Sequence, residues 1–137
     1  MGRVFFNTRE HLDTSSLTDT TTYVMLESDS GKTFMVCGGA QAITLLPAGS
    51  LVPGWKCRFI TTASPSGHKT IGAGTAIMHG SAQDAGGGTG GGTDGTPTDE
   101  ILIRAQGQPG NWLEIVCDGD AYYYNGSGSQ DNAFSTS

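Results

Sequence analysis

The sequence predicts an all-β protein, an antiparallel β-sandwich or jelly-roll-like barrel of about nine short strands. Composition is the first indication, because 22 of the 137 residues are glycine, Thr and Ser are abundant, and only 15% are charged. Such a chain favours strands and turns over helices. The second is regular turn spacing between short β-prone runs, with no candidate helix longer than two turns. The length suits one domain.

Residues 1–19 are polar and irregular apart from the triplet Val4–Phe6. This composition predicts an N-terminal arm ahead of a β-domain over residues 20–125. Phe5 and Phe6 either anchor the arm on a neighbouring subunit or pack on their own domain. The sequence does not decide between these two alternatives.

The first half of the β-domain divides at turn signals. Ser28–Gly31 is a turn signal. Ser30–Thr33 contains a GKT triplet but lacks the first glycine of the Walker pattern, and it is expected to form a hairpin turn because it lies between two predicted strands. Pro47–Gly49 and Pro53–Gly54 end the next runs. The expected strands are Thr20–Leu26, Lys32–Cys37, Ala42–Leu46 and Trp55–Thr62, with weaker ones at Lys69–Ile71 and Ala76–Met78.

The run Trp55–Thr62 has the clearest period of two. Trp55, Cys57, Phe59 and Thr61 share one face, and Lys56 and Arg58 point the other way.

The second half contains a glycine-rich stretch over residues 80–98, which is expected to form a mobile surface loop. Strands are predicted at Glu100–Gln106, Trp112–Cys117 and Ala121–Asn125. The tripeptide Asp118–Asp120 predicts a tight hairpin between the last two strands. Residues 126–137 are expected to form a flexible C-terminal tail.

Charge and motifs argue against several functions. A net charge of −6 without a basic patch excludes general nucleic-acid binding, and no segment is apolar enough to span a membrane. The three cysteines show no zinc-site spacing and are expected as free thiols, and the three histidines show no metal-binding spacing. The glycines at 86–92 lack the Lys and the helix of a phosphate-binding loop. We therefore expect no enzyme activity, no cofactor and no metal.

Two stretches together resemble a β-module of tailed-bacteriophage structural proteins. The first contains YVMLESDSGKTFMV, AITLLPAG and LVPGWKCRFI between Tyr23 and Ile60, and the second is NWLEIVCDGDAYYYNGSG at Asn111–Gly128. The match covers about half of the chain. The glycine-rich run at residues 86–95 is not part of this pattern.

The resemblance implies a structural virion protein, namely a capsid decoration (cement) subunit. Such subunits form homotrimers on the capsid surface, bind the major capsid protein and assemble in the host cytoplasm. Candidate capsid or subunit contacts are Arg3, Phe5, Phe6, Arg9, Tyr122 and Tyr124. The alternative is a head- or tail-fibre module, or a spike, that binds a host surface receptor. One side of the triplet Tyr122–Tyr124 is expected outside the core or at a subunit interface, because Tyr123 points away from its neighbours.

Overall fold

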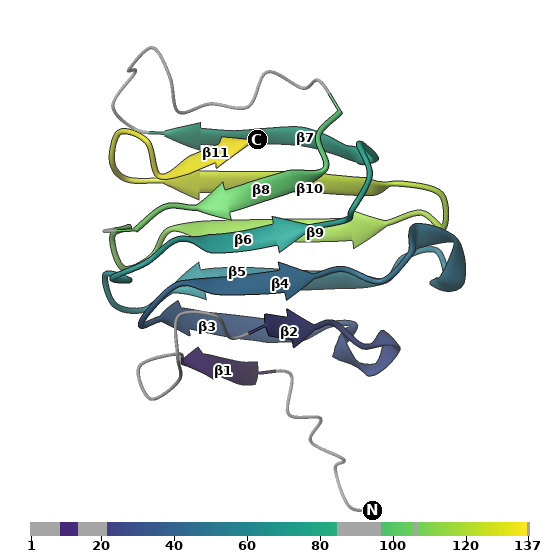
Figure 1. Cartoon of the computed structure of the whole chain (residues 1–137), viewed down its shortest axis with the longest axis horizontal. Coiled ribbons are helices and arrows are strands. Elements are labelled where there is room, and N and C mark those ends of the chain that lie inside the picture. Colours follow the sequence, from purple (N-terminus) through teal and green to yellow (C-terminus); the bar gives the residue numbers. More distant parts are fainter. Residues whose placement is uncertain (1–8, 14–21, 85–96, 106, 137) are drawn as a thin grey trace, which may run out of the picture.

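The computed structural model describes residues 9–13, 22–84, 97–105 and 107–136. These residues form eleven strands and two short 3₁₀ turns, η1 (Glu27–Asp29) and η2 (Ala48–Ser50). The strands build two stacked sheets that do not close into a barrel (Figure 1). The predicted all-β sandwich is therefore confirmed. No helix within the described residues is long and apolar enough to cross a membrane.

Sheet A has six strands in the order β1-β3-β5-β9-β10-β7. Their bounds are β1 Arg9–Asp13, β3 Thr33–Cys37, β5 Lys56–Thr61, β9 Trp112–Cys117, β10 Tyr122–Gly128 and β7 Met78–Asp84. Sheet B has five strands in the order β11-β8-β6-β4-β2. Their bounds are β11 Phe134–Thr136, β8 Glu100–Ile103, β6 Lys69–Gly72, β4 Gln41–Thr44 and β2 Thr22–Val24.

Consecutive strands alternate between the two sheets from β2 to β9, so neighbours within a sheet are often parallel. In sheet A, β3 pairs in parallel with β1 and β5, and in sheet B, β4 pairs in parallel with β2 and β6. The expected antiparallel arrangement holds for the β5–β9–β10 and β6–β8–β11 pairs. Both sheets therefore contain parallel as well as antiparallel pairs. The chain reverses direction each time it crosses to the other sheet, so two strands of one sheet that are separated by a strand of the other run in the same direction.

The connection after β2 is one place where a predicted hairpin is wrong. The sequence predicted a hairpin at Ser30–Thr33, but β2 and β3 lie in different sheets and η1 connects them. Asp29 holds the connection because its buried carboxylate accepts hydrogen bonds from the Leu26 N–H, the Tyr23 hydroxyl and the Lys32 ammonium at 2.8 to 3.1 Å. The turn is therefore fixed by a polar side chain that also satisfies the backbone.

The core lies between the sheets and follows the predicted alternation. Trp55, Cys57, Phe59 and Thr61 are each at most 5% exposed, as their shared face required. Phe34 stacks on Phe59 with ring centroids 5.3 Å apart. The remaining fully buried large side chains are Tyr122, Lys69, Phe134, Met25, Ile43, Ile71, Met78, Ile101, Leu113 and Ile115.

The C-terminal tail predicted to be flexible is instead part of the sandwich. β10 continues to Gly128, and β11 pairs antiparallel with β8. Phe134 is fully buried, although the serine-rich sequence around it did not predict a strand. β7 also continues to Asp84 inside the predicted loop, whose residues 85–96 lie outside the described part. Of the predicted arm, only Arg9–Asp13 is described, as β1.

Candidate functional site

The predicted contact residues fall into three groups. Arg3, Phe5 and Phe6 lie outside the described residues, and Arg9 begins β1. Tyr122 and Tyr124 are 0% and 4% exposed. They face sheet B, and the Tyr122 hydroxyl donates across the sandwich to the Leu46 carbonyl. Both belong to the core, so their prediction as partner contacts is wrong.

Tyr123 is the member of the triplet that points outward, with 48% of its surface exposed. The hairpin Asp118–Asp120 sets this orientation, because it pairs Cys117 with Tyr122 and so Val116 with Tyr123. The Asp118 carboxylate accepts the backbone N–H groups of Asp120 and Ala121 at 2.9 and 2.8 Å. The predicted hairpin is confirmed, and it turns Tyr123 onto the outer face of sheet A.

The outer face of sheet A combines side chains from five neighbouring strands. The strand register aligns them in rows: Met35, Ile60, Trp112 and Ser127 form one row, and Thr33, Arg58, Glu114 and Asn125 form the next. A third row joins Lys56, Val116, Tyr123 and His79. We call this set of side chains the outer face.

Two ring contacts organise the outer face. The Arg58 guanidinium lies over the Trp112 ring, 4.8 Å from its centroid. The His79 and Tyr123 rings are stacked, with centroids 5.8 Å apart and an interplanar angle of 26°. Because these four side chains project from four hydrogen-bonded strands, their positions are held by the sheet itself.

Electrostatics at the Tyr123 end depend on Asp118. A hydrogen bond to the Asp118 carboxylate raises the pKa of Tyr123 above its usual value. Hydrogen bonds from the backbone N–H groups of Ala121 and Asp120 lower the pKa of Asp118 below its usual value. At neutral pH the Tyr123 phenol is therefore neutral and the Asp118 carboxyl is ionised. The outer face thus offers hydrogen-bond acceptors as well as donors at this end.

Trp112, which was not among the predicted contact residues, is half-buried on the outer face. The available signal was Glu114, which has the same phase in β9 as Trp112, while Leu113, Ile115 and Cys117 occupy the opposite, buried phase. A strand with a carboxylate on one side and three apolar residues on the other buries the apolar side.

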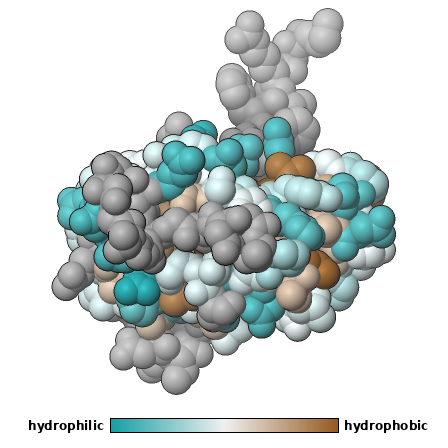
Figure 2. Space-filling view, turned by 90° about the horizontal axis from the view of Figure 1, so that it is seen from above, coloured by the Kyte–Doolittle hydropathy of each residue, from teal (hydrophilic) through white to brown (hydrophobic). Residues whose placement is uncertain are grey.

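The described surface on the side of β7 and β11 is less distinctive. Seen from above, the side of the molecule with β7 and β11 is mostly hydrophilic or intermediate, with scattered hydrophobic atoms (Figure 2). Among the described residues no group of three or more His, Cys, Asp or Glu side chains is placed to hold a metal ion. No disulfide joins Cys37, Cys57 and Cys117, all of which lie in the described part of the chain, as expected.

Comparisons with protein-family models, curated protein sequences and solved structures find no match to this chain.

Proposed function

We propose that this protein is a capsid decoration subunit of a tailed bacteriophage, attached to the major capsid protein through the outer face of sheet A. The observation that supports this most is the Arg58–Trp112 contact at the centre of a surface formed by five neighbouring strands. Arg and Trp are the residues most enriched at the centres of protein interfaces, together with Tyr. The sequence resemblance to phage structural modules supplies the kind of partner.

The distribution of side chains on the outer face suits a protein partner. Met35, Ile60 and Trp112 offer a continuous row of apolar area, and Arg58 and Glu114 supply charges beside it. An apolar centre with polar surroundings is the usual anatomy of a protein interface. The proposal includes a homotrimer. Three copies around a local threefold axis of the capsid would each place the outer face against the major capsid protein.

A fibre or spike module that binds a host surface is the competing proposal. The Tyr123–His79 stack favours it, because aromatic rings next to polar Asn125 and Ser127 also suit a sugar ligand. The two proposals differ in copy number, since a decoration subunit covers the lattice and a fibre occupies few positions.

Attachment to phage heads that lack the protein tests the proposal directly. The purified chain is added back to such heads, and bound protein is measured after sedimentation. Trp112→Ala should lower the affinity at least about 30-fold, the effect of truncating an interface hot spot of about 2 kcal/mol. The matched control is Leu102→Ala on the outer side of sheet B, which should bind like the wild type. Equal binding of Trp112→Ala and the wild type would contradict the proposed interface.

A further inference from the structure

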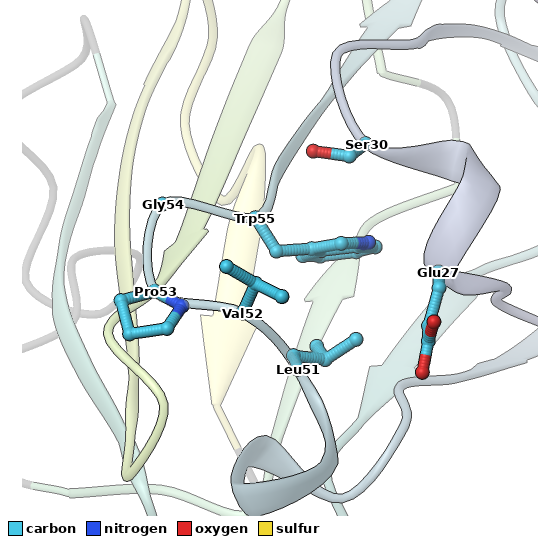
Figure 3. Close-up of a pocket in the computed structure, with 7 residues that line it drawn as sticks. All are labelled: Glu27, Ser30, Leu51, Val52, Pro53, Gly54 and Trp55. Carbon is cyan, nitrogen blue, oxygen red and sulfur yellow. The ribbon is translucent and has the colours of Figure 1, made fainter.

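Two hollows lie next to each other near the start of β5, and they differ in the side chains that line them. Figure 3 shows the first, in which the Trp55 indole lies between Ser30 and Leu51. Trp55 and Leu51 are each 5% exposed and belong to the core, and the only charged residue that lines this hollow is Glu27. The first hollow is therefore the margin of the core. The second lies beyond Ser30, on the outer side of sheet A.

The second hollow, which we call the basic hollow, has a volume of about 200 Å³. Its lining residues are Gly31, Lys32, Thr33, Lys56, Cys57, Arg58 and Glu114. Three of the seven basic residues of this acidic chain are therefore gathered at one place. The backbone fixes them there, because the Gly31 N–H donates to the Lys56 carbonyl at 2.7 Å and the Arg58 N–H donates to the Lys32 carbonyl at 3.0 Å.

Two of these three cations are not balanced by a carboxylate. Lys32 is paired with the buried Asp29 carboxylate at 2.8 Å. Within the part of the chain that the structure describes, neither Lys56 nor Arg58 forms an ion pair, although Glu114 is the cross-strand neighbour of Arg58. Lys56 and Arg58 are two residues apart on β5, so they face the same side of the sheet. Their two positive charges and the negative charge of Glu114 leave one positive charge, which suits a single carboxylate rather than a phosphate backbone.

The size and the surroundings of the basic hollow indicate a protein side chain as its occupant. Small-molecule sites usually have volumes of about 300–1,000 Å³, which is more than this hollow provides. Beside it on the outer face, Ile60 pairs with Met35 and Trp112 in an apolar row. Ile60 is two residues after Arg58 on the same face of β5, so the row and the hollow are about 7 Å apart. Neighbouring side chains of one protein segment have this spacing.

We propose that the basic hollow receives one Asp or Glu side chain of the partner protein, with its carboxylate beside Lys56 and the Arg58 guanidinium. The inference rests on the proposed function, because it takes the outer face as the surface that meets the partner, and it adds the charge that the partner presents. The Arg58 guanidinium already lies over the Trp112 ring, 4.8 Å from its centroid. Little side-chain freedom is therefore lost when a carboxylate binds there.

An NMR titration of the labelled chain with a capped pentapeptide, glycine-leucine-glutamate-leucine-glycine, tests the basic hollow without any capsid. We expect amide shifts at residues 31–33 and 56–58, and binding about five-fold weaker after Lys56→Gln, because a charge-assisted contact is lost. The same peptide with glutamine in place of glutamate should also bind about five-fold more weakly to the wild type. Arg104→Gln, the control variant, removes a cation outside the hollow and should leave the affinity unchanged. Equal binding of the two peptides, or no shifts at these residues, would overturn the proposal.

Attachment to phage heads that lack the protein separates this inference from the proposed function. Lys56→Glu should lower the affinity for heads more than Lys56→Gln does, and added salt should reduce the difference because it screens exposed charges. If Trp112→Ala weakens attachment while Lys56→Glu binds like the wild type, the interface stands and the carboxylate contact is wrong. If the wild type does not attach while the glutamate peptide binds in the basic hollow, the decoration role is wrong and the carboxylate site stands.

Discussion

The Arg58 guanidinium lies over the ring of Trp112, 4.8 Å from its centroid, on adjacent antiparallel strands of sheet A. Both side chains face away from the core, since Phe59 and Leu113 beside them are completely buried. A cation held over an indole contributes about 0.5–1 kcal/mol at an exposed site and more when a partner removes the surrounding water. The contact would therefore become stronger if a partner covered it, as the proposed interface requires.

Two neighbouring residues of the tyrosine triplet, Tyr122 and Tyr123, should differ in their contribution to stability. Tyr122→Phe removes the hydroxyl that donates to the Leu46 carbonyl and should cost about 1–3 kcal/mol of unfolding free energy, because the carbonyl loses its partner. Tyr123→Phe should change that free energy by less than about 0.5 kcal/mol, as is usual for surface positions. Urea denaturation measures both. Equal losses for the two variants would contradict the inward and outward assignments.

Substitution of Phe134 should show that β11 is folded and packed in the core. Phe134→Ala is expected to cost about 3–5 kcal/mol, because it opens a cavity at a fully buried site of β11. Thr136→Ala on the same strand is exposed and serves as the control. Thermal and urea unfolding check the pair. If Phe134→Ala unfolds like the wild type, the tail frays as its sequence suggested.

Gly80 should tolerate no side chain. Its φ of +151° is unfavourable for other residues, and an added Cβ would lie 1.9 Å from the Tyr124 carbonyl oxygen on the paired strand. Gly80→Ala should therefore cost more than about 3 kcal/mol, beyond the usual range for one substitution. Gly72→Ala in β6 is the matched control, since its added Cβ would meet only ordinary contacts at 3.8 Å or more. Similar unfolding midpoints for both variants would show that β7 does not pair with β10 in this register.

Asp118 should make stability depend on pH in the acid range. Backbone N–H groups lower its pKa below the ordinary value of 3.8, so its contribution is fully present above pH 3.8. That contribution is lost as the pH falls through the lower, folded value. Asp118→Asn should be less stable than the wild type at pH 7, and the difference should shrink below about pH 4.

Denaturation at a series of pH values measures this effect. Asp120→Asn removes the same charge two residues away and should show a smaller difference from the wild type at each pH. A difference for Asp118→Asn that stays constant down to pH 2 would contradict the role of the ionised carboxylate in the hairpin.

Local rules predicted much of the sheet structure. The period of two in Trp55–Thr61 identified the buried face, and Asp118–Gly119 identified the β9–β10 hairpin. Both depend on residues close together in the chain, whose steric and hydrogen-bonding preferences act without the rest of the fold.

Strand pairing could not be predicted in the same way. β3 pairs in parallel with β5, and the strand between them in the sequence, β4, belongs to the other sheet. No turn sequence therefore predicts this pairing. Alternation also gives two phases and does not say which one is buried. For Tyr122–Tyr124 both phases are aromatic, and only the packing against sheet B decides that Tyr123 is exposed. The rows of the outer face depend on these long-range pairings, whereas the outward phase of Trp112 could be predicted from Glu114 within the same strand.

The most direct test of the proposed decoration role is the copy number of this chain in purified particles of a phage whose genome encodes it. Quantitative mass spectrometry against the major capsid protein gives this number. The proposed decoration role predicts hundreds of copies in a fixed ratio near one per capsid subunit. A few dozen copies or fewer, or complete absence from the particle, would contradict it.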